Sequence, residues 1–172
     1  MNFSLEVGPH TDLETLPPVK DVYVTMLPGG DYKETAAKSG DLVKKGFNPV
    51  PHFPARSILD EQQLKDFITR CKDVGTKQAL VIGGSRDPIG KFDSSIQILE
   101  TGFFEGIKIG IAGHPEGSPD ISDKELEKAM MDKKPYADYI VTQWLLDSQP
   151  IVDFISKQSV PVHVGITGPM KI

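Results

Sequence analysis

The side chains best suited to chemistry stand at or just beyond the ends of short apolar runs. They are Glu6, Thr25, His52, Ser85 with Asp87, His114 with Ser118, Gln143 and His163. Carboxylates and imidazoles transfer protons near neutral pH, whereas hydroxyl and amide groups hold substrates by hydrogen bonds. The pattern therefore predicts a polar site that several separate segments of the chain build together.

Two of these residues interrupt runs that are otherwise apolar. An unpaired carboxylate is costly to bury, so Glu6 is either functional or part of a structural ion pair. Gln143 lies within the run Ile140 to Leu146, where a buried amide either binds a ligand or ties down a neighbouring backbone group. His52 follows a segment with two prolines and equally fits a hydrogen-bonded core histidine.

The four histidines all lie near these expected sites, and a ring of imidazoles can hold a metal. They are His10, His52, His114 and His163. Their spacing does not favour a metal, because the chain has no H-x-H, H-x-x-x-H or H-E-x-x-H pair. We therefore assign no metal ligands, and a metal-dependent hydrolase is kept only as a weak alternative.

The apolar runs that must position these residues have the length and composition of strands. The expected strands cover residues 3–7, 22–27, 47–53, 79–83, 107–112, 139–144 and 160–166. Most are apolar at nearly every position, which is typical of parallel strands that are buried on both faces.

Helical patterns separate the expected strands. The strongest follows Asp60, where Leu64, Phe67, Ile68 and Cys71 share one face and Gly75 ends the helix, so Cys71 is read as a core residue. A second helix is expected from Ser122, with Glu125 at capping-box spacing. Further helices are expected over about 32–45, 93–101 and 148–157, whereas the connection from Thr11 to Asp21 allows a turn or two at most.

Strands alternating with helices imply right-handed crossovers and an α/β fold, either an open doubly wound sheet or a closed barrel. Seven consecutive units favour a TIM-type (β/α)8 barrel. A complete barrel needs about 200–250 residues, whereas this chain has 172. We therefore expect one barrel domain over 1–172 that lacks the eighth strand and last helices. It is either a fragment truncated at its C-terminus or a subunit whose open seam a partner covers.

Composition narrows the possible partners and compartment. The net charge is −5, and the Lys and Arg residues are interleaved with acids, which argues against a nucleic-acid site. The pair Lys133-Lys134 is read as part of a charged surface. One cysteine, no basic-then-apolar leader and no run long enough to span a bilayer together predict a cytoplasmic protein.

Taken together, the segments resemble those of the methylenetetrahydrofolate reductase family. Similar motifs are Gly113–Asp120 (GHPEGSPD) after the fifth strand and Val141–Asp147 (VTQWLLD) at the sixth. Earlier segments also match in order: Ser4–Val7 (SLEV), Val24-Thr25, Val50–Phe53 (VPHF) and Ile82–Pro88 (IGGSRDP). The likeness covers nearly the whole chain and is nearest to a compact, divergent branch of the family.

This resemblance implies a flavoprotein oxidoreductase of one-carbon metabolism and methionine biosynthesis. Such a barrel holds FAD at the carboxyl ends of its strands and reduces 5,10-methylenetetrahydrofolate to 5-methyltetrahydrofolate with NAD(P)H. In this resemblance, Glu6 stands at the position of the family's catalytic acid. Gln143 and Asp87 stand at positions that bind the folate. Matched FAD-binding positions are Thr25, His52, Ser85, Asp87, His114 and Ser118. The resemblance implies a reduced folate and NAD(P)H as ligands. The chain is expected either to form a homo-oligomer or to associate with a partner through the open seam of the barrel.

Two positions depart from the family pattern. When this sequence is aligned with the family pattern without a gap, the family's aspartate after the fourth strand falls on Ser85. Asp87 stands two residues later. Ser118 replaces the second histidine of the H-P-E-G-H-P pattern. These departures motivate an alternative function, a folate- or flavin-binding barrel subunit without reductase turnover.

Overall fold

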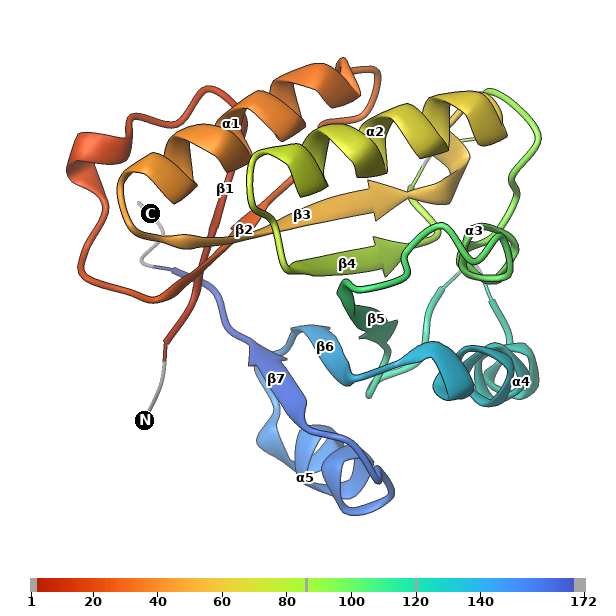
Figure 1. The fold of residues 1–172 in the computed structure, drawn as a ribbon. Coiled ribbons are helices and arrows are strands. Elements are labelled where there is room, and N and C mark those ends of the chain that lie inside the picture. The colour runs from red at the N-terminus through yellow and green to blue at the C-terminus, as the bar shows by residue number, and fades with distance from the viewer. Residues whose placement is uncertain (1–2, 86, 120, 169–172) are drawn as a thin grey trace. The chain divides into compact units, whose positions relative to one another are not determined.

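The computed structural model describes residues 3–85, 87–119 and 121–168. Its strands alternate with helices along the chain (Figure 1). The strands are β1 (Leu5–Val7), β2 (Asp21–Val24), β3 (Asn48–Pro54), β4 (Gln78–Ile82), β5 (Lys108–Gly113), β6 (Tyr139–Trp144) and β7 (Val162–Gly165). The α-helices are α1 (Tyr32–Lys44), α2 (Glu61–Asp73), α3 (Ser95–Leu99), α4 (Asp123–Lys133) and α5 (Ser148–Ser156). Three short 3₁₀-helices are η1 (Leu13–Thr15), η2 (Ala55–Ser57) and η3 (Lys134–Tyr136).

The described residues form seven parallel strands, an incomplete TIM-type α/β barrel whose complete form has eight. Each strand expected from the sequence overlaps one observed strand, and each expected helix is present. The expected fold class is therefore confirmed. The connection before β2 holds only the single turn η1, as its length predicted.

The chain forms two compact units, Met1–Lys108 and Ile109–Ile172. In the first unit, β1 to β4 pair in chain order and in parallel. In the second unit, β5, β6 and β7 do the same. Within each unit the strands therefore lie in chain order, as the strands of a (β/α)8 barrel do.

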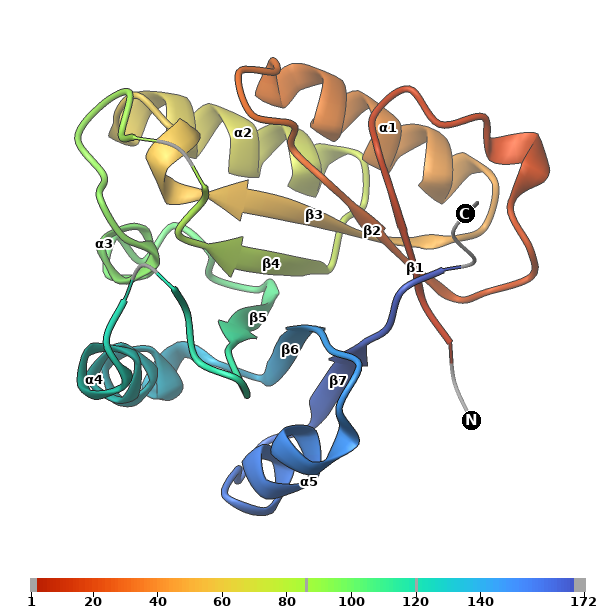
Figure 2. The ribbon, with the colours of Figure 1, turned by 180° about the vertical axis from the view of Figure 1, so that it is seen from behind.

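In the first unit, α1 and α2 lie side by side and cover one face of β2, β3 and β4 (Figures 1 and 2). Phe53 of β3 packs on Phe67 of α2, with ring centres 4.1 Å apart, and both side chains are fully buried. Successive side chains of a strand point to opposite faces, so His52 lies on the face away from the helices. We call this the inner face of the first unit.

Helix α2 shows why the sequence pattern was informative. Asp60 caps its N-terminus, because Asp60 Oδ1 accepts a hydrogen bond from the backbone N–H of Gln63 at 2.8 Å. Its four apolar residues are all buried, and Gly75 takes a φ of 94° just after the last turn. Burial raises the pKa of the Cys71 thiol to about 12, which confirms Cys71 as a core residue.

The second unit confirms the helix expected at Ser122 but corrects the surface expected at Lys133. Ser122 and Glu125 form the predicted capping box of α4. Lys133, however, is only 8% exposed. It lies in the last turn of α4, where the long alkyl stem packs inward. Within the described ranges, none of the helices has the length and apolar character needed to cross a bilayer.

Candidate functional site

The carboxyl ends of β1 and β2 bring Glu6 and Thr25 together on the inner face. Glu6 pairs with Tyr23 in the strand register, and Thr25 follows β2 with its N–H donating to the carbonyl of Val7 at 2.9 Å. The Thr25 hydroxyl donates to Glu6 Oε1 at 3.0 Å. Glu6 itself is exposed, so the carboxylate is held in place but remains accessible to a ligand.

His52 completes this cluster from β3, and we call Glu6, Thr25 and His52 the inner-face group. The His52 side chain is buried, at 5% exposure, and its Nε2 atom has no hydrogen-bond partner among the described residues. Burial lowers the pKa of His52, and the negative charge of Glu6 opposes that shift. Because burial is the larger cause, His52 is neutral at pH 7.

Tyr23 is a member of this site that the sequence reasoning missed. It is buried on β2, and its ring meets the His52 ring edge-on with centres 6.0 Å apart. A search confined to polar residues at strand ends passes over an aromatic residue in mid-strand. The available signal was the two-residue period, which places Tyr23 and Thr25 on the same face of β2.

Ser85 and Asp87 lie on the loop that follows β4 rather than within the inner-face group. Both are exposed, and neither forms a hydrogen bond to another described residue. The loop itself is anchored: Arg56 N–H donates to the Gly83 carbonyl at 2.9 Å, and Arg56 Nε donates to the Asp93 carbonyl at 2.8 Å. Their assignment to FAD and folate contacts stays a prediction.

In the second unit, His114 and Ser118 belong to the turn that follows β5. The His114 carbonyl accepts from the N–H of Gly117 at 3.1 Å, and Ser118 forms an isolated bridge with Ile121. Partial burial lowers the pKa of His114, and the positive charge of Lys133 lowers it further. Lys133, read from the sequence as a surface residue, is therefore the electrostatic neighbour of a predicted site residue.

Gln143 and His163 also lie in the second unit. Gln143 is exposed near the end of β6, and its backbone carbonyl accepts from the Thr142 hydroxyl at 2.8 Å. His163 of β7 stacks on Tyr139, with ring centres 4.7 Å apart. Among the described residues, the exposed Gln143 side chain forms no hydrogen bond to a backbone group. Its assignment to folate binding stays a prediction.

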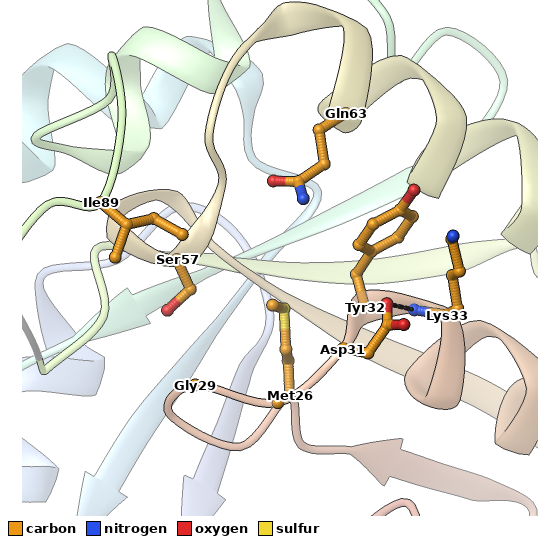
Figure 3. Close-up of a pocket in the computed structure, with 9 residues that line it drawn as sticks. Met26, Gly29, Asp31, Tyr32, Lys33, Ser57, Gln63 and Ile89 are labelled. Atoms are coloured by element: carbon orange, nitrogen blue, oxygen red, sulfur yellow. Dashed lines mark hydrogen bonds between the residues drawn. The ribbon is translucent and has the colours of Figure 1, made fainter.

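A pocket of about 500 Å³ opens beside the loops that follow β2, β3 and β4 (Figure 3). We call it the loop pocket. Its lining residues are Met26, Gly29, Gly30, Asp31, Tyr32, Lys33, Ser57, Gln63 and Ile89. The sequence search missed all nine, because it examined only the first residues beyond each strand, whereas the pocket is built by loop tips and the first turns of helices.

Among the described residues, no three His, Cys, Asp or Glu side chains come together as a metal site would require. The metal-dependent hydrolase considered from the four histidines therefore has no ligand set in this part of the chain. His10 instead lies 3.6 Å from the Glu34 carboxylate at the surface.

The fold is shared with solved enzymes. A protein from Burkholderia cenocepacia J2315 that is provisionally named a phosphonomutase matches with a TM-score of 0.65 and 10% identity, over 95% of this chain and 77% of its own. Tryptophan synthase from M. tuberculosis, in an aminoacrylate- and BRD0059-bound form, matches with a TM-score of 0.55 and 13% identity, over 86% of this chain and 62% of its own. No family model matches the sequence.

These comparisons overturn the expected family. The solved structures are a mutase and a synthase, so the resemblance to methylenetetrahydrofolate reductase, with flavin-dependent folate reduction in methionine biosynthesis, is wrong. The misleading motifs are short segments at strand ends, where barrels of unrelated functions all place their site residues. FAD binding by itself, like the partners expected with it, stays a prediction. At these identities, the comparisons identify the chain as a TIM-type barrel and no more.

Proposed function

We propose that the chain is an enzyme that transfers a proton to or from a small substrate at the carboxyl ends of β1, β2 and β3. Glu6 is the proposed general base, and Thr25 is the residue that positions it. The observation that carries this proposal is the 3.0 Å hydrogen bond from the Thr25 hydroxyl to an exposed carboxylate on the inner face. In barrel enzymes, catalytic residues lie at this end of the strands.

The geometry assigns different roles to the two oxygens of Glu6. Oε1 accepts from Thr25, and Oε2 has no partner among the described residues. A carboxylate that is oriented through one oxygen offers the other to the hydrogen of a bound substrate. Proton abstraction from a carbon beside a carbonyl or phosphonate group then leaves the Glu6 carboxyl group protonated, and the proton returns to the product in the reverse step.

The neutral His52 leaves the Glu6 carboxylate without a cationic partner on β3. A protonated imidazole would pair with Glu6 and withdraw its negative charge from the substrate. Because burial lowers the pKa of His52, the imidazole carries no such charge at pH 7. The negative charge of Glu6 is therefore not neutralised by His52.

The comparisons support an enzyme in this class of fold without specifying its substrate. The name phosphonomutase indicates a phosphonate, and the other match is a synthase. We therefore choose phosphonates and 2-oxo acids as the first substrates to test, because both classes acidify a neighbouring C–H bond.

The test is exchange of substrate hydrogen for deuterium in D₂O, followed by proton NMR. We expect the chain to catalyse exchange in at least one of these compounds. Glu6→Gln should reduce the exchange rate by about 100-fold or more, since general base catalysis supplies about 10²–10⁴-fold. Thr25→Val should cost about tenfold, because it removes only the orienting hydrogen bond.

Glu105→Gln is the matched control, because it makes the same chemical change at an exposed loop position of the first unit. Exchange by this variant should equal that of the wild type. The proposal fails if no compound of either class exchanges, or if the folded Glu6→Gln variant exchanges at the wild-type rate.

A further inference from the structure

The loop pocket contains polar groups that the fold leaves without partners. Gln63 Oε1 accepts from the N–H of Leu59 at 2.6 Å, so only the amide NH₂ of Gln63 is available to a ligand. Asp31 Oδ1 accepts from the N–H of Lys33 at 2.9 Å. The second Asp31 oxygen and the Ser57 hydroxyl form no hydrogen bond with any residue in the described ranges. The pocket thus offers a donor, an acceptor and a hydroxyl that can serve as either.

Met26, Ile89 and the Tyr32 ring supply the apolar part of the lining between these groups. Met26 and Gln63 point toward each other across the pocket, with Ser57 and Ile89 on one side and Tyr32 on the other (Figure 3). Ile89 is 57% exposed, whereas Met26 is buried beneath the pocket. A pocket that combines some apolar side chains with unpaired polar groups can hold a small molecule, and a volume of about 500 Å³ is within the range of such sites.

An anion is a poor occupant even though α1 begins here. The first amides of a helix attract anions, but the Asp31 carboxylate already caps this end. An incoming phosphate would meet that negative charge. The Lys33 ammonium lies 5.8 Å from the centre of the Tyr32 ring, so a cation–π contact already engages it. The carboxylates of Asp31 and of Glu34 in the first turn therefore both oppose an anion at this end of α1.

We propose that the loop pocket binds an uncharged, amino-substituted nitrogen heterocycle such as the adenine ring. Its amino group donates to Asp31, and its neighbouring ring nitrogen accepts from the Gln63 amide or the Ser57 hydroxyl. Met26 and Ile89 contact the ring. The loop pocket contains no member of the inner-face group, so this inference does not rest on the proposed proton transfer.

The experiment is calorimetric titration of the 172-residue chain with adenosine and with inosine. These nucleosides have the same sugar and nearly the same size, but inosine presents an acceptor and a donor where adenosine presents a donor and an acceptor. Adenosine should bind at least about tenfold more tightly, because inosine turns an acceptor toward the Asp31 carboxylate and a donor toward the Gln63 amide, so neither hydrogen bond forms. Inorganic phosphate should not bind and should not displace adenosine.

Gln63→Glu is the informative variant. The variant retains an oxygen that accepts from the Leu59 N–H, so the start of α2 is kept. It replaces the amide NH₂ donor that faces the pocket with a carboxylate oxygen, which is an acceptor. Adenosine affinity should fall by about tenfold or more. Gln62→Glu makes the same change at an exposed neighbouring position and should leave affinity unchanged. If Gln63→Glu fails to fold by circular dichroism, Ser57→Ala tests the same contact and should weaken adenosine binding.

Three results would overturn the proposal. The first is the absence of measurable adenosine binding. The second is equal affinity for adenosine and inosine, which would mean that the polar groups of the pocket do not distinguish the two heterocycles by hydrogen bonding. The third is competition by phosphate, which would mean that the pocket takes an anion. Loss of exchange in Glu6→Gln with intact adenosine binding would leave this inference standing, so the two proposals fail separately.

Discussion

His52 is the residue whose ionisation most directly affects the inner-face group. It is buried, it meets Tyr23 edge-on, and Glu6 is the charged group that acts on it. A proton on His52 would place a charge in a buried site where Nε2 has no acceptor within the described part of the chain. The neutral state of His52 is therefore a property of the fold and not of the imidazole alone.

This argument predicts how stability depends on pH. The pKa of His52 is lowered on folding, so below about pH 6.5, the ordinary value for histidine, the unfolded chain binds a proton that the folded chain does not. The free energy of unfolding should fall as the pH decreases, by at most about 1.4 kcal/mol per pH unit for one such group. Urea denaturation at several pH values between 5 and 8 measures the slope.

His52→Gln should flatten this slope. His114 also has a lowered pKa and should account for part of the slope that remains. Gln62→Ala, which removes no titratable group from an exposed position, is the control and should retain the wild-type slope. A His52→Gln protein with an unchanged slope would contradict a buried neutral histidine.

At the scale of elements, α2 links the two candidate sites of the first unit. Its buried face packs Phe67 on Phe53 of β3, the residue that follows His52. Its first turn supplies Gln63 to the loop pocket. The position where α2 begins therefore fixes both the strand behind the inner-face group and one wall of the loop pocket.

The contribution of the N-terminal cap of α2 to the free energy of unfolding should accordingly be measurable. Asp60→Ala removes the acceptor for the Gln63 N–H and should lower the free energy of unfolding by about 1 kcal/mol, within a range of roughly 0.5–2 kcal/mol. Equilibrium urea denaturation measures the change. Gln62→Ala in the same turn, which has no capping role, should change stability by less than about 0.5 kcal/mol. Equal effects of the two substitutions would remove the cap as the cause.

At the scale of the whole molecule, the first unit has an aromatic centre. Phe53 is fully buried between Phe67 and Phe104, with ring centres 4.1 Å and 5.1 Å away. These rings join β3, α2 and the segment before β5 behind the inner face. The core of this unit therefore supports the strands whose ends carry Glu6, Thr25 and His52.

Phe53→Ala should destabilise the protein by about 3–5 kcal/mol, because it removes a ring and leaves a cavity that rigid strands cannot close. Thermal and urea unfolding monitored by circular dichroism measure the loss. Phe3→Ala makes the same substitution at a side chain that is 59% exposed, and it should cost little. Similar losses for both variants would refute the position of the core.

The sequence by itself determined the strands, the helices and the barrel class, because period, capping residues and stop glycines are local signals. It also singled out Glu6, Thr25 and His52, since catalytic groups of barrels stand at strand ends. Only the tertiary structure decided that Thr25 holds Glu6, that Lys133 is buried, and that Asp31, Ser57 and Gln63 share a pocket. Such facts depend on contacts between segments far apart in the chain, and short motifs at strand ends do not encode them. For the same reason, those motifs suggested a reductase family when they reported only the architecture of a barrel.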